Sequence, residues 1–462
     1  MENKSQETNQ NVNNSYDKTR DTFGSRLGII AAAAGSAIGL GNIWKFPYIT
    51  GVNGGAAFIV VYLACIAVIG LPVMLAEFII GRRSQKNAVG AFKKLAPGTP
   101  WFLVGVMGVL SAFMILAYYG VVAGWTLEYI VKSGTGALAG MSPEQIESVF
   151  GGFIGSTVRP IIWQIVFMAI TASIVVSGVK EGIEKYSKIL MPLLLAILLI
   201  LCVRSITLPG AVKGLEFLFR PDFSKLSAQG VLIALGHAFF SLSLGMGTML
   251  TYASYIGKRE SLGKIATQVT VSDTLIALLA GIAIFPAVFA FNIEPGSGPG
   301  LVFVTLPNVF NKMPGGPLFA ALFFVLLAIA ALTSAISILE VVVSYTVEEL
   351  KMPRKRATII ATVIITLLGI PSSLAMGPMA GFKIAGLNYF DFLDWTTASI
   401  LMPVGGLLIT AFLGWYWGRE KTREELSSEG TLKIRYIGLF MFVCKYIAPA
   451  AVAAVFLYGL FK

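Results

Sequence analysis

An apolar stretch with an interrupted middle constrains this chain more than any other feature. Residues 26–50, RLGIIAAAAGSAIGLGNIWKFPYIT, are apolar enough to enter a membrane, but three glycines, Ser36 and Asn42 lie near the centre. Glycine loses the most backbone entropy in a helix, and short polar side chains compete for backbone hydrogen bonds. The stretch therefore predicts a membrane helix that breaks at mid-depth. Because unwound backbone in hydrocarbon must be buried in protein or line a wet cavity, such a break is a candidate binding site.

A second stretch of the same kind occurs later in the chain. Residues 229–256, GVLIALGHAFFSLSLGMGTMLTYASYIG, are again apolar, with glycines, Ser241 and Ser243 near the centre. Two broken membrane segments in corresponding places of two halves are the best sequence sign of a transporter built from inverted repeats. The pair predicts two discontinuous helices that share one site.

Composition places the whole chain in a membrane. Hydrophobic residues make up 56% of the sequence and charged residues 13%, whereas soluble domains contain roughly 25% charged residues. The net charge of +11 is explained by Lys and Arg in cytoplasmic loops, and no nucleic-acid partner is expected. Residues 1–22 are polar, and the segment lacks a signal-peptide pattern. We therefore expect residues 1–25 to form a cytoplasmic N-terminal tail.

The hydropathy pattern predicts an all-α integral membrane protein with eleven transmembrane helices. They start near positions 26, 56, 101, 160, 187, 229, 265, 317, 357, 391 and 435. We expect one transporter domain over residues 26–462, with repeats at about 26–205 and 229–416 and an extra helix at about 435–460. Alternate loops carry 24 and nine Lys or Arg residues, which predicts a cytoplasmic N-terminus and an extracellular C-terminus in the plasma membrane.

Ionisable side chains at membrane depth are functional candidates, because each costs several kcal/mol unless it meets a partner or a cavity. They are Lys45, Glu77, His237, Asp273, Glu340, Asp394 and Lys445. Glu77 could bind unwound backbone, either as a brace alone or nearer to a ligand. Asp273 suits a sodium site, with an internal hydrogen-bond role as the alternative. His237 is either a satisfied core histidine or a proton-coupling group.

Several segments together resemble one transporter family. GLGNIWKFPY and SLSLGMG carry the resemblance, with NGGAAF, EFIIGR, AYYGVVAGWTL, TYASY and LTSAISI in the same order along the chain. They are similar to the signature segments of the neurotransmitter:sodium symporter family, in particular its bacterial amino-acid transporters with the leucine-transporter fold. The multi-hydrophobic substrate type with eleven helices is the most similar. The resemblance implies a five-plus-five inverted repeat with discontinuous helices 1 and 6.

The resemblance also implies a substrate pocket and two sodium sites. The pocket would comprise Ser36, Ala37, Gly39, Gly41, Ile115, Tyr119, Phe240, Ser241, Ser243, Met246, Ser334 and Ile338. The first sodium site would use the Ala37 carbonyl with Asn42, Ser241 and Asp273, and the substrate carboxylate. The second would use carbonyls of Gly35, Ile38 and Ala330 with hydroxyls of Thr333 and Ser334.

Departures from the family pattern bear on substrate and ion use. Amine-transporting relatives place an aspartate where this chain has Gly39, so the resemblance implies an amino acid, here a neutral hydrophobic or aromatic one. Asp273 stands where most relatives carry asparagine, and Ala277 where chloride-dependent members have a serine. A fixed carboxylate beside sodium makes chloride redundant, so chloride is not expected. This depends on the register, in which Ser272 is the alternative to Asp273.

The resemblance further implies two gates and a flexible fifth span. Lys45 and Asp394 would form an outer ion pair; the inner gate would involve Arg20, Phe23, Tyr255 and Glu348. Gly182 and Pro192 bracket nine residues, a spacing that in related transporters permits unwinding, whereas an ordinary interfacial start with a kink is the alternative.

The sequence therefore predicts a sodium-coupled symporter of hydrophobic amino acids that works by alternating access. A proton-coupled transporter using His237 or Glu77, and a non-transporting amino-acid sensor or channel on the same scaffold, are the rivals. An enzyme is disfavoured because no cluster of nucleophile, base and orienting group occurs, nor any metal-ligand spacing.

Overall fold

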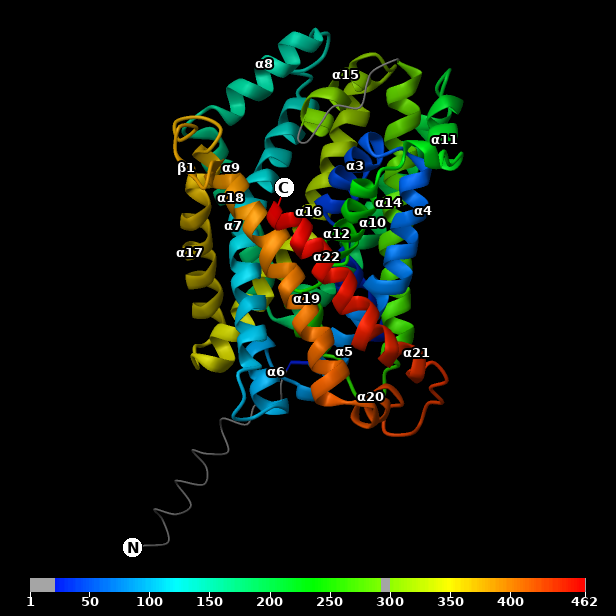
Figure 1. Cartoon of the computed structure of the whole chain (residues 1–462). Coiled ribbons are helices and arrows are strands. Elements are labelled where there is room, and N and C mark those ends of the chain that lie inside the picture. Colours follow the sequence, from blue (N-terminus) through cyan, green and yellow to red (C-terminus); the bar gives the residue numbers. More distant parts are fainter. Residues whose placement is uncertain (1–20, 292–299, 462) are drawn as a thin grey trace, which may run out of the picture.

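The computed structural model describes residues 21–291 and 300–461, which form an almost entirely helical bundle (Figure 1). Helical segments occur at all eleven predicted spans. Within the described residues, eight helices are long and apolar enough to cross a membrane, and two bent pairs bring the number to ten. The sixth predicted span consists of two shorter helices. The all-α prediction is therefore confirmed.

The first half of the chain contains spans one to five. Its elements are α2 (Arg26–Ala37), η1 (Gly41–Lys45), α3 (Phe46–Val52), α4 (Ala56–Cys65), η2 (Ile66–Gly70), α5 (Leu71–Ser84), α6 (Ala88–Leu95), α7 (Phe102–Gly134), α8 (Pro143–Ile154), α9 (Arg159–Val175), η3 (Val179–Glu184) and α10 (Lys185–Ile206). The η elements here are π-helical turns that continue neighbouring α-helices, so that α4, η2 and α5 form one span of 29 residues.

The second half contains spans six to eleven. Its elements are α11 (Val212–Phe219), η4 (Phe223–Lys225), α12 (Ala228–Ser241), α13 (Thr248–Ala253), α14 (Leu262–Ala290), η5 (Leu301–Thr305), α15 (Leu306–Asn311), α16 (Gly316–Glu349), α17 (Arg354–Leu374), β1 (Lys383–Ile384), β2 (Leu387–Asn388), α18 (Tyr389–Trp395), η6 (Thr396–Leu401), α19 (Met402–Ala411), η7 (Phe412–Trp417), α20 (Arg419–Leu426), α21 (Ile437–Phe442), η8 (Val443–Ile447) and α22 (Ala448–Phe461). The strands form a two-stranded antiparallel hairpin.

Two long helices form the centre of the bundle. α16 packs along α7. Of the most apolar 18-residue stretch of α16, 78% is buried inside the protein, the highest fraction of any continuous span. A helix that is apolar all round is expected to be enclosed by other helices. α2 lies against α16, α10 and α14, which places the first broken span inside the bundle.

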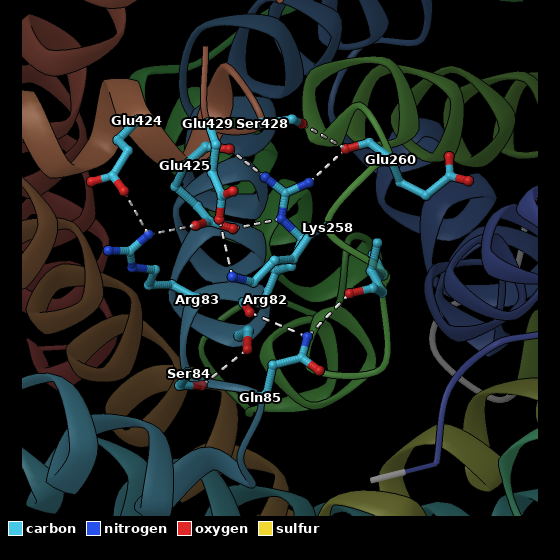
Figure 2. Close-up of polar contacts among 12 residues, drawn as sticks. Arg82, Arg83, Ser84, Gln85, Lys258, Glu260, Glu424, Glu425, Ser428 and Glu429 are labelled. Atoms are coloured by element: carbon cyan, nitrogen blue, oxygen red, sulfur yellow. Dashed lines mark hydrogen bonds and ion pairs between the residues drawn. The ribbon is translucent and has the colours of Figure 1, made fainter. Parts of the chain in front are cut away.

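The two ends of the bundle are built differently. Figure 1 shows α6, α20 and α21 at one end and α8, α11 and α15 at the other. At the α20 end, charged side chains from α5, α20 and the loop after α13 form a dense network (Figure 2). The buried Arg82 guanidinium binds the Glu425 carboxylate, with Nε and Oε1 2.5 Å apart, and donates to the Glu260 carbonyl. These contacts hold α20 against the end of α5.

Candidate functional site

The first broken span bends where its sequence predicts. α2 ends at Ala37, the next helical turn starts at Gly41, and the two segments meet at an angle of 50°. The cap residue Ile38 is extended, with φ −76° and ψ 100°. A Cβ atom at Gly39 would lie 2.4 Å from the Ser334 Oγ and 3.1 Å from the Tyr119 hydroxyl, so a larger residue would force these side chains to move.

The second broken span has a longer unwound section. α12 ends at Ser241 and α13 starts at Thr248. Between them Gly245 and Gly247 have φ values of 76° and 79°, which glycine adopts without a steric penalty, and Ser243 has a φ of 54°, which is uncommon for a residue with a side chain. The Ser243 hydroxyl donates to the Ser36 carbonyl at 2.9 Å. The two breaks are therefore joined directly, as the sequence predicts.

Glu77 on α5 binds the unwound section of the second broken span and the first turn of α13. Its two carboxylate oxygens accept hydrogen bonds from the backbone N–H groups of Gly245, at 2.7 Å, and Leu250, at 3.2 Å. The side chain is fully buried. Hydrogen bonds to an ionised acceptor are stronger than neutral ones, so this geometry suits a brace for the broken helix.

A small cavity lies between the two breaks. Its lining contains eleven of the twelve residues predicted for the substrate pocket, together with Leu40: Ser36, Ala37, Gly39, Gly41, Ile115, Tyr119, Phe240, Ser243, Met246, Ser334 and Ile338. Ser241, the twelfth, lies beside this cavity and points toward Asp273. The volume is about 20 Å³, room for about one water molecule. The walls must therefore move apart before an amino acid can enter.

The side chains predicted for the first sodium site converge next to that cavity. Asn42 donates to the Asp273 carboxylate at 2.7 Å and to the Ser241 hydroxyl at 3.3 Å, and Ser241 lies 3.0 Å from both Asp273 oxygens. All three are buried. Asp273, and not Ser272, is thus the residue that faces Asn42. The Ser241 and Asp273 oxygens are ligands of the hard type that sodium requires, whereas Asn42 turns its amide nitrogen to them and its amide oxygen accepts from the Gly39 N–H at 3.1 Å.

The residues predicted for the second sodium site also converge. The Thr333 hydroxyl lies 3.1 Å from the Ala330 carbonyl and 3.5 Å from the Ile38 carbonyl. The Ser334 hydroxyl lies 3.4 Å from the carbonyls of both Gly35 and Ile38. An all-oxygen set from the end of α2 and the middle of α16 fits a small hard cation. Within the described residues no group of three or more His, Cys, Asp or Glu side chains competes for a metal.

A larger cavity of about 640 Å³ lies outside Phe240 and includes both residues of the predicted outer ion pair. Lys45 and Asp394 line it, but they do not form an ion pair in this structure; the Lys45 ammonium lies 4.4 Å from the centre of the Phe240 ring. His237 also lines this cavity and contacts the rings of Phe46 and Tyr62. Its two ring nitrogens have no hydrogen-bond partner among the described residues.

The predicted inner gate is only partly described. Arg20 lies outside the described residues. Phe23 packs edge-on against Tyr255, and the Tyr255 hydroxyl donates to Glu340 at 2.6 Å. Glu348 accepts hydrogen bonds from the backbone and side chain of Asn87, at 3.0 and 3.1 Å.

Sequence reasoning missed Glu340 and Arg354 as members of this inner cluster. Arg354 binds Glu340, with Nη2 and Oε2 2.5 Å apart, and donates to the Val175 carbonyl. The buried position of Glu340 within a membrane span was the available signal, but its partner lies outside that span. The fifth span is helical throughout: Gly182 lies in η3 and Pro192 inside α10.

Comparison with known proteins identifies the family. The chain matches the sodium:neurotransmitter symporter family over residues 20–146 and 154–462. It is 40% identical over 435 residues to the sodium-dependent transporter YhdH of Bacillus subtilis, covering 94% of this chain and 96% of the relative. A sodium-dependent transporter of Haemophilus influenzae is 38% identical over 456 residues, covering 96% of this chain and 99% of the relative.

A solved structure shares the fold. The crystal structure of MhsT in complex with L-phenylalanine superposes with a TM-score of 0.88 at 49% identity, and the match covers 95% of this chain and 100% of that one. The resemblance drawn from the signature segments is confirmed, and so is the fold with two discontinuous helices. The protein is a membrane transporter and not an enzyme. It belongs to the sodium:neurotransmitter symporter family.

Proposed function

We propose that this protein carries neutral hydrophobic or aromatic L-amino acids into the cell together with two sodium ions, and that it needs no chloride. The observation that carries the proposal is the convergence of predicted pocket residues and oxygen ligands at the two helix breaks. The names of the relatives support it: YhdH is called sodium-dependent, and MhsT was crystallised with L-phenylalanine.

Coupling follows from the position of the first sodium site. Asn42, Ser241 and Asp273 lie beside the cavity in which the substrate carboxylate would sit near Gly39 and Gly41. A carboxylate that touches both sodium and the N–H groups of the break strengthens both binding events. By linkage, sodium raises substrate affinity by the same factor as substrate raises sodium affinity. The membrane potential then contributes about 2.3 kcal/mol per charge per 100 mV.

The cavity walls support the substrate class. Gly39 has no side chain that could pair with an amine. A Cβ atom there would lie 2.4 Å from the Ser334 Oγ, so a side chain would also crowd the pocket. Ile115, Met246 and Ile338 supply apolar walls, and methionine adapts to side chains of different shape. Tyr119, whose hydroxyl accepts from the Leu40 N–H at 3.3 Å, and Phe240 would close the pocket.

Asp273 supports chloride independence. Its carboxylate is fully buried and lies within hydrogen-bond distance of Asn42 and Ser241, so a fixed negative charge already stands beside the first sodium site. A second anion there would be repelled. Ala277, one turn further along α14, offers no hydroxyl to a chloride ion.

We further propose a cytoplasmic N-terminus and alternating access between an outer and an inner gate. Lys45 and Asp394 line the cavity on one side of Phe240. Phe23, Tyr255 and Glu348 would contribute to the inner gate, together with Arg20, which lies outside the described residues. Closure of the outer gate would bring the Lys45 ammonium from Phe240 to Asp394.

The test is uptake of labelled L-phenylalanine into proteoliposomes. Uptake should require an inward sodium gradient, should persist when chloride is replaced by gluconate, and should stop when sodium is replaced by choline at constant pH. Equal uptake in choline would refute sodium coupling. Uptake that follows an imposed pH gradient without sodium would favour the proton-coupled alternative. Binding without uptake would favour a sensor.

A further inference from the structure

A cavity of about 630 Å³ lies at the α20 end of the bundle, away from the transport site. It is bounded by the start of α2, by α5, by the start of α14 and by residues 432–436 of the segment between α20 and α21. Its lining contains three cations, Arg26, Lys264 and Lys433, and no carboxylate. The cavity is therefore strongly positive.

These three cations differ from their neighbours at the same end of the bundle. Arg82, Arg83 and Lys258 each bind a carboxylate of the α20 region, as Figure 2 shows. Within residues 21–291 and 300–461, by contrast, no carboxylate pairs with the three cations of the cavity; Arg26 makes one neutral hydrogen bond, to the Gln268 amide oxygen at 3.2 Å. Their charge is thus available to an anion.

The same cavity contains the N-terminus of a long helix. α14 has 29 residues, and its N-cap residue Ser261 makes no side-chain capping bond. Ser261, Gly263 and Lys264 all line the cavity. The hydroxyl of Tyr436 approaches the same turn so closely that a Cβ atom at Gly263 would lie 2.5 Å from it. Free N–H groups and the helix dipole favour an anion such as phosphate at this position.

The cavity continues onto an apolar surface of the membrane span. Leu71 and Leu75 of α5 form part of its wall. The face of α14 that carries Lys264 and Gln268 continues through Val271 and Leu275, which are 58% and 51% exposed. A ligand with an anionic head and apolar chains would match both parts of this surface, whereas a free phosphate would match only the first.

We propose that this cavity binds the headgroup of an anionic phospholipid. The phosphate lies at the N-terminus of α14 among Arg26, Lys264 and Lys433, and the acyl chains lie along α14 over Val271 and Leu275. The ion pairs of Figure 2 hold α20 in place, so that the segment carrying Lys433 is positioned before the lipid arrives. Basic pockets between membrane helices on the cytoplasmic side are suited to such lipids.

The test is lipid retention by the full chain, measured by native mass spectrometry after delipidation in a neutral detergent. Dioleoyl-phosphatidylglycerol should be retained as one molecule per protein and more tightly than dioleoyl-phosphatidylcholine. The variant Lys264→Gln/Lys433→Gln should lose roughly 25-fold in affinity for phosphatidylglycerol, about fivefold for each cation. Lys433→Gln alone, in a segment outside the helices, should lose about fivefold.

The matched control is Lys355→Gln/Arg356→Gln, which removes two exposed cations from the first turn of α17. It should retain phosphatidylglycerol like the wild type. Equal retention of the two lipids by the wild type, or an equal loss in the control variant, would overturn the proposal. Displacement of phosphatidylglycerol by inorganic phosphate would assign the cavity to a soluble anion and overturn the lipid assignment.

Discussion

Replacing Glu77 with alanine should loosen the second helix break and destabilise the whole protein. The carboxylate accepts two backbone hydrogen bonds, from Gly245 at 2.7 Å and from Leu250 at 3.2 Å, and it is fully buried. Without it, two buried N–H groups lose their acceptor. Each unsatisfied group costs about 1–3 kcal/mol, so the free energy of unfolding should fall by roughly 2–6 kcal/mol.

Glutamine at the same position should have a smaller effect. Its amide oxygen can accept one of the two hydrogen bonds, but its amide nitrogen then faces the N–H of the other partner. The expected loss is roughly 1–3 kcal/mol, for one donor left unsatisfied. Because the loosened section carries Ser243 and directly follows Ser241, phenylalanine binding in sodium should weaken as well. The affinity falls tenfold for each ~1.4 kcal/mol by which the substitution destabilises the bound arrangement of the site.

The assay is unfolding of the purified protein in detergent, followed by tryptophan fluorescence during titration with SDS. Phenylalanine binding is measured at several sodium concentrations in parallel. The control is Glu216→Gln, which changes an exposed carboxylate on α11 and should shift the free energy of unfolding by less than about 0.5 kcal/mol. If Glu77→Ala unfolds like the control, the brace has no energetic role and the reasoning is wrong.

Three further predictions concern single contacts. Asp273→Asn should raise the sodium concentration needed for half-maximal uptake and introduce chloride dependence, measured in chloride against gluconate buffer; unchanged ion dependence contradicts the charge role. Gly39→Ala should lower phenylalanine uptake at least roughly tenfold at normal expression, because the new methyl group overlaps Ser334 and about 1.4 kcal/mol of strain is enough. Arg82→Gln should lower the free energy of unfolding by roughly 3 kcal/mol, the lower end for a broken buried pair, because the Glu425 carboxylate keeps only its 3.5 Å contact with the partly exposed Arg83; recovery in Arg82→Met/Glu425→Leu would support this, and a fully stable single variant would not.

The fold and much of the candidate site could be predicted because their signals are local. A glycine-rich interruption in an apolar run is visible within 25 residues, and all eleven predicted spans occur as helical segments. Once a break is located in the sequence, the residues that flank it are known. The family resemblance added the pocket residues of α7 and α16 that face them. This is why eleven predicted pocket residues line one cavity.

Contacts between distant segments could not be predicted in the same way. Tyr255 binds Glu340, 85 residues away, and Arg82 binds Glu425, 343 residues away. Their pairing depends on how the helices pack and where the loops run. Lys45 lies over Phe240 and not beside Asp394, and this position likewise depends on the conformation of the outer gate.

The amino-acid sequence by itself determined that this chain enters a membrane, where two of its helices must break, and which residues lie at the breaks. Backbone entropy, hydropathy and local hydrogen bonding act over a few residues, so they can be read in order along the chain. Only the tertiary structure decided that Asp273 and not Ser272 faces Asn42, which backbone N–H groups the predicted brace Glu77 binds, and that three cations share a cavity at the start of α14. These facts depend on helix rotation and on packing between segments far apart in the chain, which no local pattern contains.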